Sequence, residues 1–277
     1  MKRVNQILSI VALGLFTITA QACNEKNTKK ETATASTEVT ENKLPDHSSG
    51  VEQTETIPAD VKTGEFTIKA GAVLETLYFN TDAKNFASIA KEYGKEVAKN
   101  GGQLVAQFEV VKKSTERPVT HIAIVQWTNL AGYAKVASSS AFAKAKKSLI
   151  DVGFFGAQQD TPVVFRDDKI YDFTSAWTIA TAPEQMPVIM QVMQTYFGKI
   201  GPVMGKYGIA QTAFVGPHPG APKTSATAYT PQMMGIFQWN DINDPKKFQN
   251  DPDFTAHVDI RDAVMSKMEF IYTKAIL

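Results

Sequence analysis

Few residues in this sequence carry the chemistry of common enzymes. The 277 residues hold one cysteine, Cys23, and four histidines. A disulfide and the common structural zinc sites both need several cysteines, so neither can form within the chain. P-loop, GxGxxG, HExxH and GxSxG motifs are absent as well. We therefore expect no metal site, and the sequence by itself names no reaction.

The charges are nearly balanced and spread along the chain. Lys and Arg number 29 against 28 Asp and Glu, which gives a formal net charge of +1. Proteins that bind nucleic acid usually carry a clustered positive charge, so we expect no nucleic-acid partner. After the N-terminal apolar run no second long apolar segment occurs, and the rest of the chain is expected to fold in water.

The N-terminal residues have the pattern of an export signal. Lys2-Arg3 form a short basic segment, and residues 7–20 are almost wholly apolar. That run matches the hydrophobic region of a signal peptide and is shorter than the roughly 20 residues that span a bilayer. It ends in Ala20-Gln21-Ala22, a small-x-small cleavage pattern. We predict that residues 1–22 are a signal peptide.

Cys23 follows the predicted cleavage site directly, and this position resembles the lipobox of bacterial lipoproteins. The resemblance implies acylation of Cys23, a membrane partner and a location in the cell envelope, outside the cytoplasm, at the outer membrane or periplasmic face. Ala20 and Gln21 depart from the usual lipobox residues. Cleavage by the general signal peptidase, followed by secretion, is therefore the alternative.

A polar spacer follows the cysteine. Residues 24–63 contain no Phe, Tyr or Trp and are rich in Thr, Glu, Lys, Ser and Asn. Such a composition buries too little apolar surface to offset the entropy lost on ordering. We interpret residues 23–63 as an acylated cysteine and a disordered spacer that holds a folded domain away from the membrane.

An internal repeat organises the remaining residues. Ile124-Val125-Gln126-Trp127 recurs as Ile236-Phe237-Gln238-Trp239, and Phe142 and Phe254 are related by the same offset. Repeats of this kind indicate duplicated structural units. We place the first unit at residues 64–168 and the second at 169–277.

Hydrophobic periodicity predicts the same element order in both units. In the first unit we expect strands at 73–80, 103–111 and 121–127, helices at 86–97 and 133–150, and extended structure from 162. In the second we expect strands at 170–181, 209–215, 226–239 and 270–277, a helix from 183 or 187 to 208 that Pro202 bends or breaks, and a helix ending at Ala263. Each unit thus follows β-α-β-β-α-β, the ferredoxin-like order.

A ferredoxin-like sheet has helices on one face only, so its other face must find a partner. We therefore predict an α+β fold in which two antiparallel sheets pack face to face as an α/β barrel. Residues 68–277 resemble, on the Trp strand ends and the Asp251-Pro252 helix start with Phe254, a fused form of the dimeric α/β-barrel superfamily. That superfamily includes the antibiotic-biosynthesis monooxygenases and the stress-responsive barrels. Because each unit supplies the other's partner face, we expect a monomer.

The resemblance also suggests a ligand site. In haem-degrading members, a strand Trp, a helix His and an Asn of the first strand form the pocket. Asn80 and Trp127 or Trp239 match two of these residues, while Ala137 and Gln249 stand where the helix His is expected. Haem is therefore one candidate ligand, and the cofactor is otherwise unknown. The alternative is that both Trp residues are core anchors of a duplicated fold.

Three further residues are candidates for chemistry. His121 alternates with Trp127 along one strand face and would act as a base if that face lined a cavity. His257 and Arg261 lie one helical turn apart, where the Arg would hold an acidic ligand and the His would act as a base. The alternatives are a hydrogen-bonded core histidine and an exposed ladder of ion pairs.

Three functions remain open at this stage. The first is a ligand-binding lipoprotein whose barrel encloses a pocket for a small apolar or haem-like molecule. The second is an enzyme of the cofactor-independent monooxygenase type, with His121 or His257 as the base. The third is an interaction module in the cell envelope without a small-molecule site. The fold alone does not choose between them.

Overall fold

The computed structural model describes residues 60–157, 159–218 and 230–277. The predicted signal peptide, Cys23 and nearly all of the predicted spacer lie outside these residues. Within the described part of the chain, no helix is both long enough and apolar enough to cross a membrane.

The two predicted units are both present with the predicted order of elements. The first unit comprises β2 (Val73–Phe79), α2 (Ala83–Lys99), β3 (Gly102–Lys113), β4 (His121–Trp127), α3 (Leu130–Ala137), α4 (Ser140–Lys146) and β5 (Leu149–Gly156). The second comprises β7 (Ile170–Thr178), η1 (Pro183–Gln185), α5 (Met186–Lys206), β8 (Ala210–Pro217), β9 (Met233–Trp239), α6 (Asp244–Gln249), α7 (Pro252–Thr255), α8 (Val258–Asp262) and β10 (Met265–Ala275).

The eight strands of the two units form one closed barrel in the order β10-β3-β4-β2-β5-β8-β9-β7. Within each unit this is the ferredoxin-like strand order, and all neighbouring strands are antiparallel. The units join at two seams. β10 pairs with β3 over five residue pairs, whereas β5 pairs with β8 over only two. The predicted α+β fold with two ferredoxin-like units in a barrel is confirmed.

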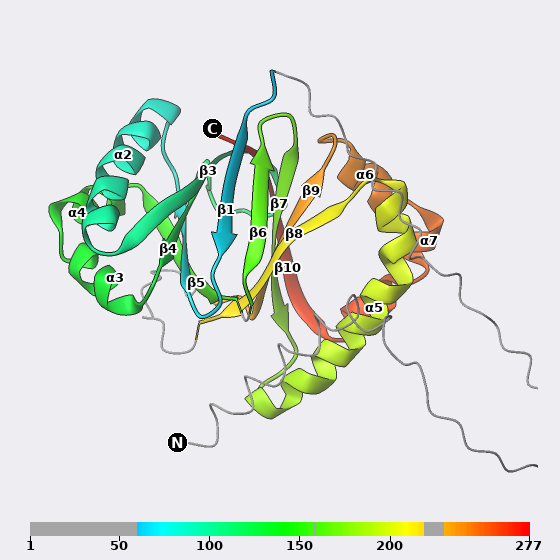
Figure 1. The fold of residues 1–277 in the computed structure, drawn as a ribbon. Helices are drawn as coiled ribbons and strands as arrows, with labels where there is room; N and C mark the ends of the chain where they lie inside the picture. Colours follow the sequence, from blue (N-terminus) through cyan, green and yellow to red (C-terminus); the bar gives the residue numbers. More distant parts are fainter. Residues whose placement is uncertain (1–59, 158, 219–229) are drawn as a thin grey trace, which may run out of the picture.

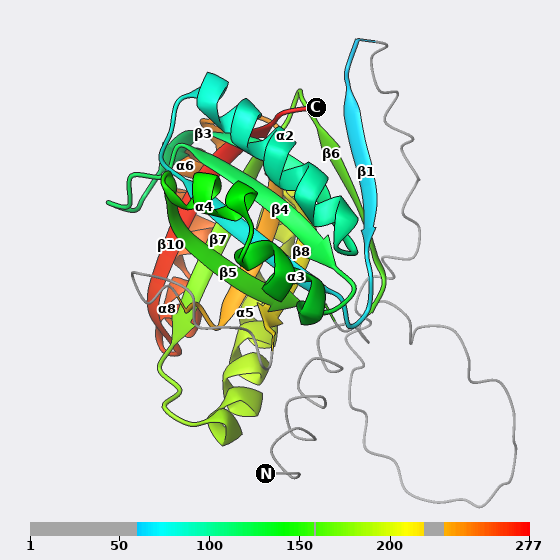
Figure 2. The same ribbon diagram turned by 90° about the vertical axis from the view of Figure 1, so that its left-hand side faces the viewer.

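Helices cover the outside of the barrel on both units. Figure 2 looks onto α2, α3 and α4 of the first unit, and Figure 1 shows α5 to α7 on the opposite side. Apolar side chains that point outward from the strands pack beneath these helices and form one cluster in each unit.

The predicted helix at 133–150 is wrong. The segment forms two short helices, α3 and α4, followed by β5. Asn129 and Ser139 each cap a new helix by accepting a hydrogen bond from a backbone N–H, so the serine-rich stretch between the helices restarts the helix instead of continuing it. The apolar run from Leu149 then pairs with β2 as a strand.

The second unit differs from prediction in similar ways. The helix expected to end at Ala263 is three short helices, α6 to α8, and the last strand begins at Met265 instead of Phe270. The long helix α5 continues through Pro202 to Lys206. Gly198, four residues before that proline, has no side chain to add to the crowding around the ring. The strand expected to begin at 226 begins at Met233, and residues 219–229 lie outside the described part.

A two-stranded ribbon stands beside the barrel. The extended structure predicted from residue 162 is its strand β6, whereas the fourth strand of the first unit is β5, and the other ribbon strand was not predicted. It pairs β1 (Thr63–Ile68) with β6 (Thr161–Arg166) in antiparallel register. In Figure 1 the ribbon lies in front of the barrel between β5 and β8, the two strands that pair over only two residue pairs. Ile68, Val163 and Phe165 belong to the same buried cluster as the side chains inside the barrel. The ribbon therefore closes the side of the barrel that the short seam leaves open.

The barrel interior is packed with large side chains of the described residues. The buried interior residues share one cluster that includes Tyr78, Phe108, Phe155, Tyr171 and Phe173. Phe108 makes edge-to-face contacts with Phe165 and Phe173 at ring-centroid distances of 4.8 and 5.0 Å. Aromatic packing of this kind fills space densely.

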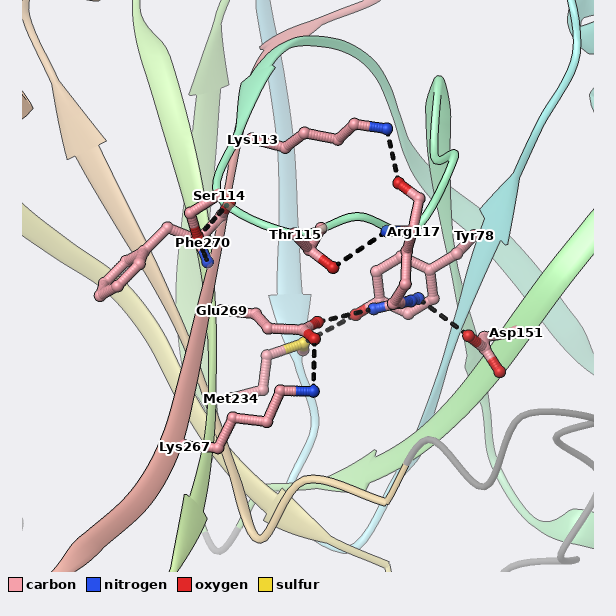
Figure 3. A network of polar contacts seen from close by, with 10 residues as sticks. All are labelled: Tyr78, Lys113, Ser114, Thr115, Arg117, Asp151, Met234, Lys267, Glu269 and Phe270. Atoms are coloured by element: carbon pink, nitrogen blue, oxygen red, sulfur yellow. Dashed lines mark hydrogen bonds and ion pairs between the residues drawn. The ribbon is translucent and has the colours of Figure 1, made fainter.

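A buried ionic network joins the two units at one end of the barrel (Figure 3). Arg117, from the β3–β4 connection, reaches Asp151 of β5 at 3.1 Å and Glu269 of β10 at 3.2 Å. Its guanidinium also lies over the Tyr78 ring, 4.7 Å from the centroid. Lys267 pairs with Glu269 at 2.7 Å. Burial by itself would raise the pKa of Glu269, but the hydrogen bonds from Lys267 and Arg117 hold that pKa below its ordinary value.

The network predicts that Arg117→Met destabilises the fold. The substitution removes the cation from between Asp151 and Glu269, whose side chains are 0% and 7% exposed. Glu269 keeps its ion pair with Lys267, but Asp151 is left buried without the arginine, and the loss of one partner of a buried ion pair typically costs about 3–5 kcal/mol. We expect a loss of that order in the free energy of unfolding from urea denaturation. Lys69→Met is the control, because it breaks an ion pair whose side chains are 60% and 56% exposed and should cost about 1 kcal/mol or less. Equal losses in the two variants would contradict the prediction.

Candidate functional site

The two units carry a buried carboxyl group at equivalent positions. Val73 lies opposite Trp127 in the β2–β4 pair, and Ile170 lies opposite Trp239 in the β7–β9 pair. Two residues further along each first strand come Glu75 and Asp172, which are 0% and 3% exposed. Both share the face of the Trp residues, because side chains alternate along a strand. Each unit therefore buries a carboxyl and an indole together between sheet and helix.

In the first unit the carboxyl and the indole satisfy each other. The Tyr93 hydroxyl donates to Glu75 Oε1 at 2.8 Å, and Trp127 Nε1 donates to Glu75 Oε2 at 2.9 Å. All three side chains are almost fully buried. Desolvation raises the pKa of Glu75 to about 7, and the hydrogen bonds from Trp127 and Tyr93 limit that rise. The site is a closed polar centre in the core.

In the second unit the tyrosine of this centre is missing. Gly101 and Gly208, each with positive φ, follow α2 and α5 at matching points, and each directly precedes the residue opposite its Trp. Counting back along the helices from these glycines places Ile200 where the first unit has Tyr93. The carboxyl is also one methylene shorter, since Asp172 replaces Glu75. Nothing in the described part of the second unit therefore repeats the closed polar centre.

Other residues around the second centre are also smaller than their counterparts. Thr174 and Ala176 stand on β7 where β2 has Leu77 and Phe79, and Gly235 stands where β4 has Ala123. A Cβ at Gly235 would lie 2.5 Å from the Phe237 ring, so the glycine is required for that ring to lie where it does. The Phe237 ring fills the place beside Gly235, so Thr174 and Ala176 are the replacements that open space between sheet and helix.

The opened space is a cavity of about 230 Å³ between the barrel and α5 to α8. Its lining is almost entirely apolar and contains five methionines, Met193, Met204, Met233, Met265 and Met268. The rest of the wall that matters for recognition consists of Asp172, Thr174, Trp239, Gln249, Arg261 and Tyr272. Methionine side chains adapt to irregular shapes, so this wall suits apolar molecules of varied form.

Two buried polar atoms of the cavity have no hydrogen-bond partner among the described residues. They are Asp172 Oδ1 and Trp239 Nε1, one an acceptor and the other a donor. Thr174 hydrogen-bonds the Asp172 carboxyl, yet desolvation dominates and raises the pKa of Asp172 to about 8. Buried polar groups without partners are costly and rare in folded proteins. Because both atoms belong to residues of the cavity wall, the cavity is the candidate ligand site of the described residues.

Two of the site residues predicted from the sequence, Trp239 and Arg261, line the cavity. Arg261 hydrogen-bonds Tyr196 and lies 6.0 Å from the Phe254 ring centroid. Its guanidinium also pairs with Asp262 at 2.7 Å, so part of its charge is already neutralised within the protein. Some of the guanidinium donors of Arg261 are therefore already used within the protein.

The structure places both predicted histidines away from the cavity. His121 lies in the first unit beneath α2, where its ring stacks on Phe86 at a centroid distance of 4.4 Å. Desolvation lowers the pKa of His121, so its ring is neutral near pH 7. His257 is the half-buried residue that precedes α8, and it does not line the cavity.

Asn80 and Trp127 are also far apart. Asn80 follows Phe79, which lies opposite His121, whereas Trp127 lies at the other end of the same strand pair opposite Val73. Seven paired residues separate the two ends, a distance of about 20 Å. The Trp127 N–H donates its hydrogen bond to Glu75, and Asn80 is exposed. The structure therefore does not bring the Asn and the Trp of the first unit together.

Haem does not fit the cavity. The volume of about 230 Å³ lies below the roughly 300–1,000 Å³ typical of pockets for drug-sized ligands, and haem is a large rigid macrocycle. No described histidine lines the cavity to serve as an axial ligand, the role that a histidine fills in many haem proteins. The donor set and the size both suit a smaller organic molecule.

Comparison with known proteins finds no matching family model and no matching curated protein. Fifty-nine chains of solved structures match. They include an anthrone oxidase-like protein (TM-score 0.46, 11% identity, 76% of this chain and 95% of that chain). They also include a mutant chlorite dismutase from Candidatus Nitrospira defluvii (TM-score 0.42, 9% identity, 74% and 92%) and a haem-binding protein from Thermus thermophilus (TM-score 0.37, 11% identity, 77% and 94%). At these identities the likeness concerns the fold alone.

The pKa of Glu75 predicts how stability depends on pH. Because the folded-state pKa of about 7 exceeds the ordinary 4.5, this group stabilises the fold most below about pH 4.5. That contribution is lost as the pH rises to about 7, on the order of 3 kcal/mol. We expect the free energy of unfolding of wild type minus that of Glu75→Gln to fall over this range in urea denaturation. Glu92→Gln on the exposed side of α2 is the control. A flat difference for Glu75→Gln would rule out the raised pKa.

Proposed function

We propose that this protein binds a small, largely apolar molecule in the second-unit cavity, and that it does so as a lipid-anchored protein of the cell envelope. The observation that carries the proposal is the cavity itself, an apolar space walled by methionines and aromatic rings that also contains two buried, unsatisfied polar atoms. Ligand pockets typically combine an apolar wall with a few convergent polar groups.

The energetic cost of the cavity supports a ligand role. Core cavities forgo packing energy in proportion to their volume, at roughly 24 cal/mol per Å³. This relation holds for closed cavities, so for a partly open one of about 230 Å³ it gives an upper bound of roughly 5 kcal/mol. The first unit avoids this loss by filling the equivalent region with Tyr93, Phe79 and Leu77. The second unit lacks this packing energy, and a bound ligand would restore it by filling the cavity.

The proposed location rests on the sequence of the first 23 residues. Acyl chains on Cys23 would hold the protein at a membrane surface, and the polar spacer would let the barrel extend from it. A carrier of apolar molecules benefits from that position, because such molecules concentrate in and near membranes. We propose a monomer, since each unit already covers the open sheet face of the other.

A second candidate function is an enzyme of the cofactor-independent oxygenase type, favoured by the raised pKa of Asp172. When ionised, this buried carboxylate would take a proton from an acidic C–H of the substrate. The resulting carbanion would add dioxygen, forming a C–O bond and, with the proton, a hydroperoxide. Loss of water from the hydroperoxide would leave a C=O group, so one oxygen atom enters the product and the other leaves as water. Asp172 lines the cavity, whereas the two histidines do not, so it is the group placed to act as base.

Filling the cavity should abolish ligand binding. Ala176→Phe introduces the residue that the first unit has at the equivalent position, Phe79, and its ring would occupy the cavity. We expect naphthalene, followed by its fluorescence, to bind wild type with a dissociation constant that rises at least tenfold in this variant. Ile179→Phe is the control, because Ile179 is 55% exposed and outside the cavity. No saturable naphthalene binding to wild type would contradict the proposed function.

Oxygen uptake separates the two candidates. An oxygenase should consume dioxygen in the presence of a substrate with an acidic C–H, such as anthrone, measured with an oxygen electrode. Asp172→Asn keeps the size of the side chain but cannot accept the proton, so uptake should fall at least a hundredfold. Binding without uptake above the buffer rate would leave the protein as a carrier.

A further inference from the structure

The first unit shows what group fits beside the carboxyl and the indole. There the Tyr93 hydroxyl lies 2.8 and 3.0 Å from the two oxygens of Glu75, and the Trp127 N–H donates to the same carboxyl. The aromatic ring of that tyrosine lies between helix and sheet and contacts Phe142. In the first unit, therefore, the phenol of a tyrosine supplies the hydrogen bonds that complete this centre.

The second unit keeps the carboxyl and the indole but lacks the phenol. Asp172 is 3% exposed and Trp239 is 5% exposed, and both line the cavity. Ile200, which also lines the cavity, stands where Tyr93 stands and carries no polar atom. The cavity thus occupies the region in which the first unit has its tyrosine ring.

We infer that the cavity binds hydroxylated aromatic molecules of the phenol class, with the ligand hydroxyl donating to Asp172 and accepting from Trp239 Nε1. This inference rests on the proposed binding function and names the ligand class of that same site. In donating to the carboxyl, the bound phenol takes the part that Tyr93 plays in the first unit. The bond from the indole differs, because Trp127 donates to Glu75, whereas Trp239 Nε1 has no partner among the described residues.

The chemistry of the two unsatisfied atoms supports a hydroxyl over other groups. A hydroxyl is both a donor and an acceptor, so one group serves Asp172 Oδ1 and Trp239 Nε1 together. An ammonium group donates to the carboxyl but accepts nothing from the indole. A carboxylate accepts from the indole but faces the Asp172 carboxyl. Arg261 gives an anion little help, because it already pairs with Asp262 at 2.7 Å.

Two other residues are placed to assist. Tyr272 lies directly opposite Asp172 on β10, and Gln249 hydrogen-bonds the Tyr272 hydroxyl. Gln249 is exposed, so this pair connects the buried carboxyl with the solvent side of the cavity. A second hydroxyl on a larger ligand would find a partner there, which favours ligands with polar groups at both ends.

The test compares p-cresol with toluene, which have the side chains of tyrosine and phenylalanine. In isothermal titration calorimetry of the whole protein, we expect p-cresol to bind at least tenfold more tightly than toluene. Asp172→Leu should reduce that preference to less than threefold, because it removes the acceptor. In ¹H–¹⁵N spectra, p-cresol should shift the indole N–H signal of Trp239, assigned with Trp239→Phe, and leave that of Trp127 unchanged.

A matched pair of variants tests the same point from within the chain. Ile200→Tyr puts a phenol at the position of Tyr93, and Ile200→Phe adds the same ring without the hydroxyl. We expect both to block p-cresol, but only the tyrosine to shift the Trp239 indole signal and to raise the melting temperature above that of the phenylalanine variant. Adding Asp172→Glu to Ile200→Tyr restores the full set of the first unit and should enlarge the difference.

The outcomes separate this inference from the proposed function. Equal affinity for p-cresol and toluene, with naphthalene still bound, would overturn the phenol class and leave an apolar binding site. No binding of naphthalene, toluene or p-cresol would overturn both. A preference for p-cresol that survives Asp172→Leu, or that shifts Trp127 instead of Trp239, would overturn the assigned hydrogen bonds.

Discussion

A carboxyl group buried between helix and sheet must be hydrogen-bonded or it destabilises the fold, and this constraint shapes both halves of the molecule. The first unit meets it with Tyr93 and Trp127, which donate to Glu75. The second unit keeps Asp172 and Trp239 at the equivalent positions without completing the set. The two halves of one fold therefore differ in a single respect that matters for function. In the first unit, side chains of the protein supply all the hydrogen bonds of the polar centre. In the second unit, Asp172 Oδ1 and Trp239 Nε1 have no partner among the described residues.

The barrel explains why the site lies outside the ring of strands. Closing two sheets edge to edge leaves an interior just wide enough for side chains, and aromatic rings fill it here. The helix-covered faces are different, because each helix packs at a distance that its own residues set. Replacing Tyr93 with Ile200 and Phe79 with Ala176 changes one such face without disturbing the ring. The second unit therefore carries a cavity on a face that the first unit fills with its own side chains.

Much of the fold could be predicted from the sequence, and the site could not. The repeated Trp127 and Trp239 identify the two units, and the open sheet faces imply the barrel. The short helices were missed because Asn129 and Ser139 act as caps, a local effect that hydrophobic periodicity does not report. The carboxyl groups were missed because each lies alone within an apolar strand. A comparison of strand registers would have found them, since Glu75 and Asp172 hold the same position relative to their Trp residues. The burial that raises the pKa values of these carboxyl groups depends on helices that lie elsewhere in the sequence.

The ribbon of β1 and β6 has a mechanical consequence for a protein held by its N-terminal segment. Any pull along that segment enters the described structure at Thr63, the first residue of β1, which pairs with Arg166. The force therefore acts first on the six residue pairs of the ribbon, which can separate one after another. The strands of the closed barrel come later along the path of the force. If the proposed anchor holds the protein at a membrane, tension would therefore separate the ribbon first, while the pairing of the barrel strands stays intact.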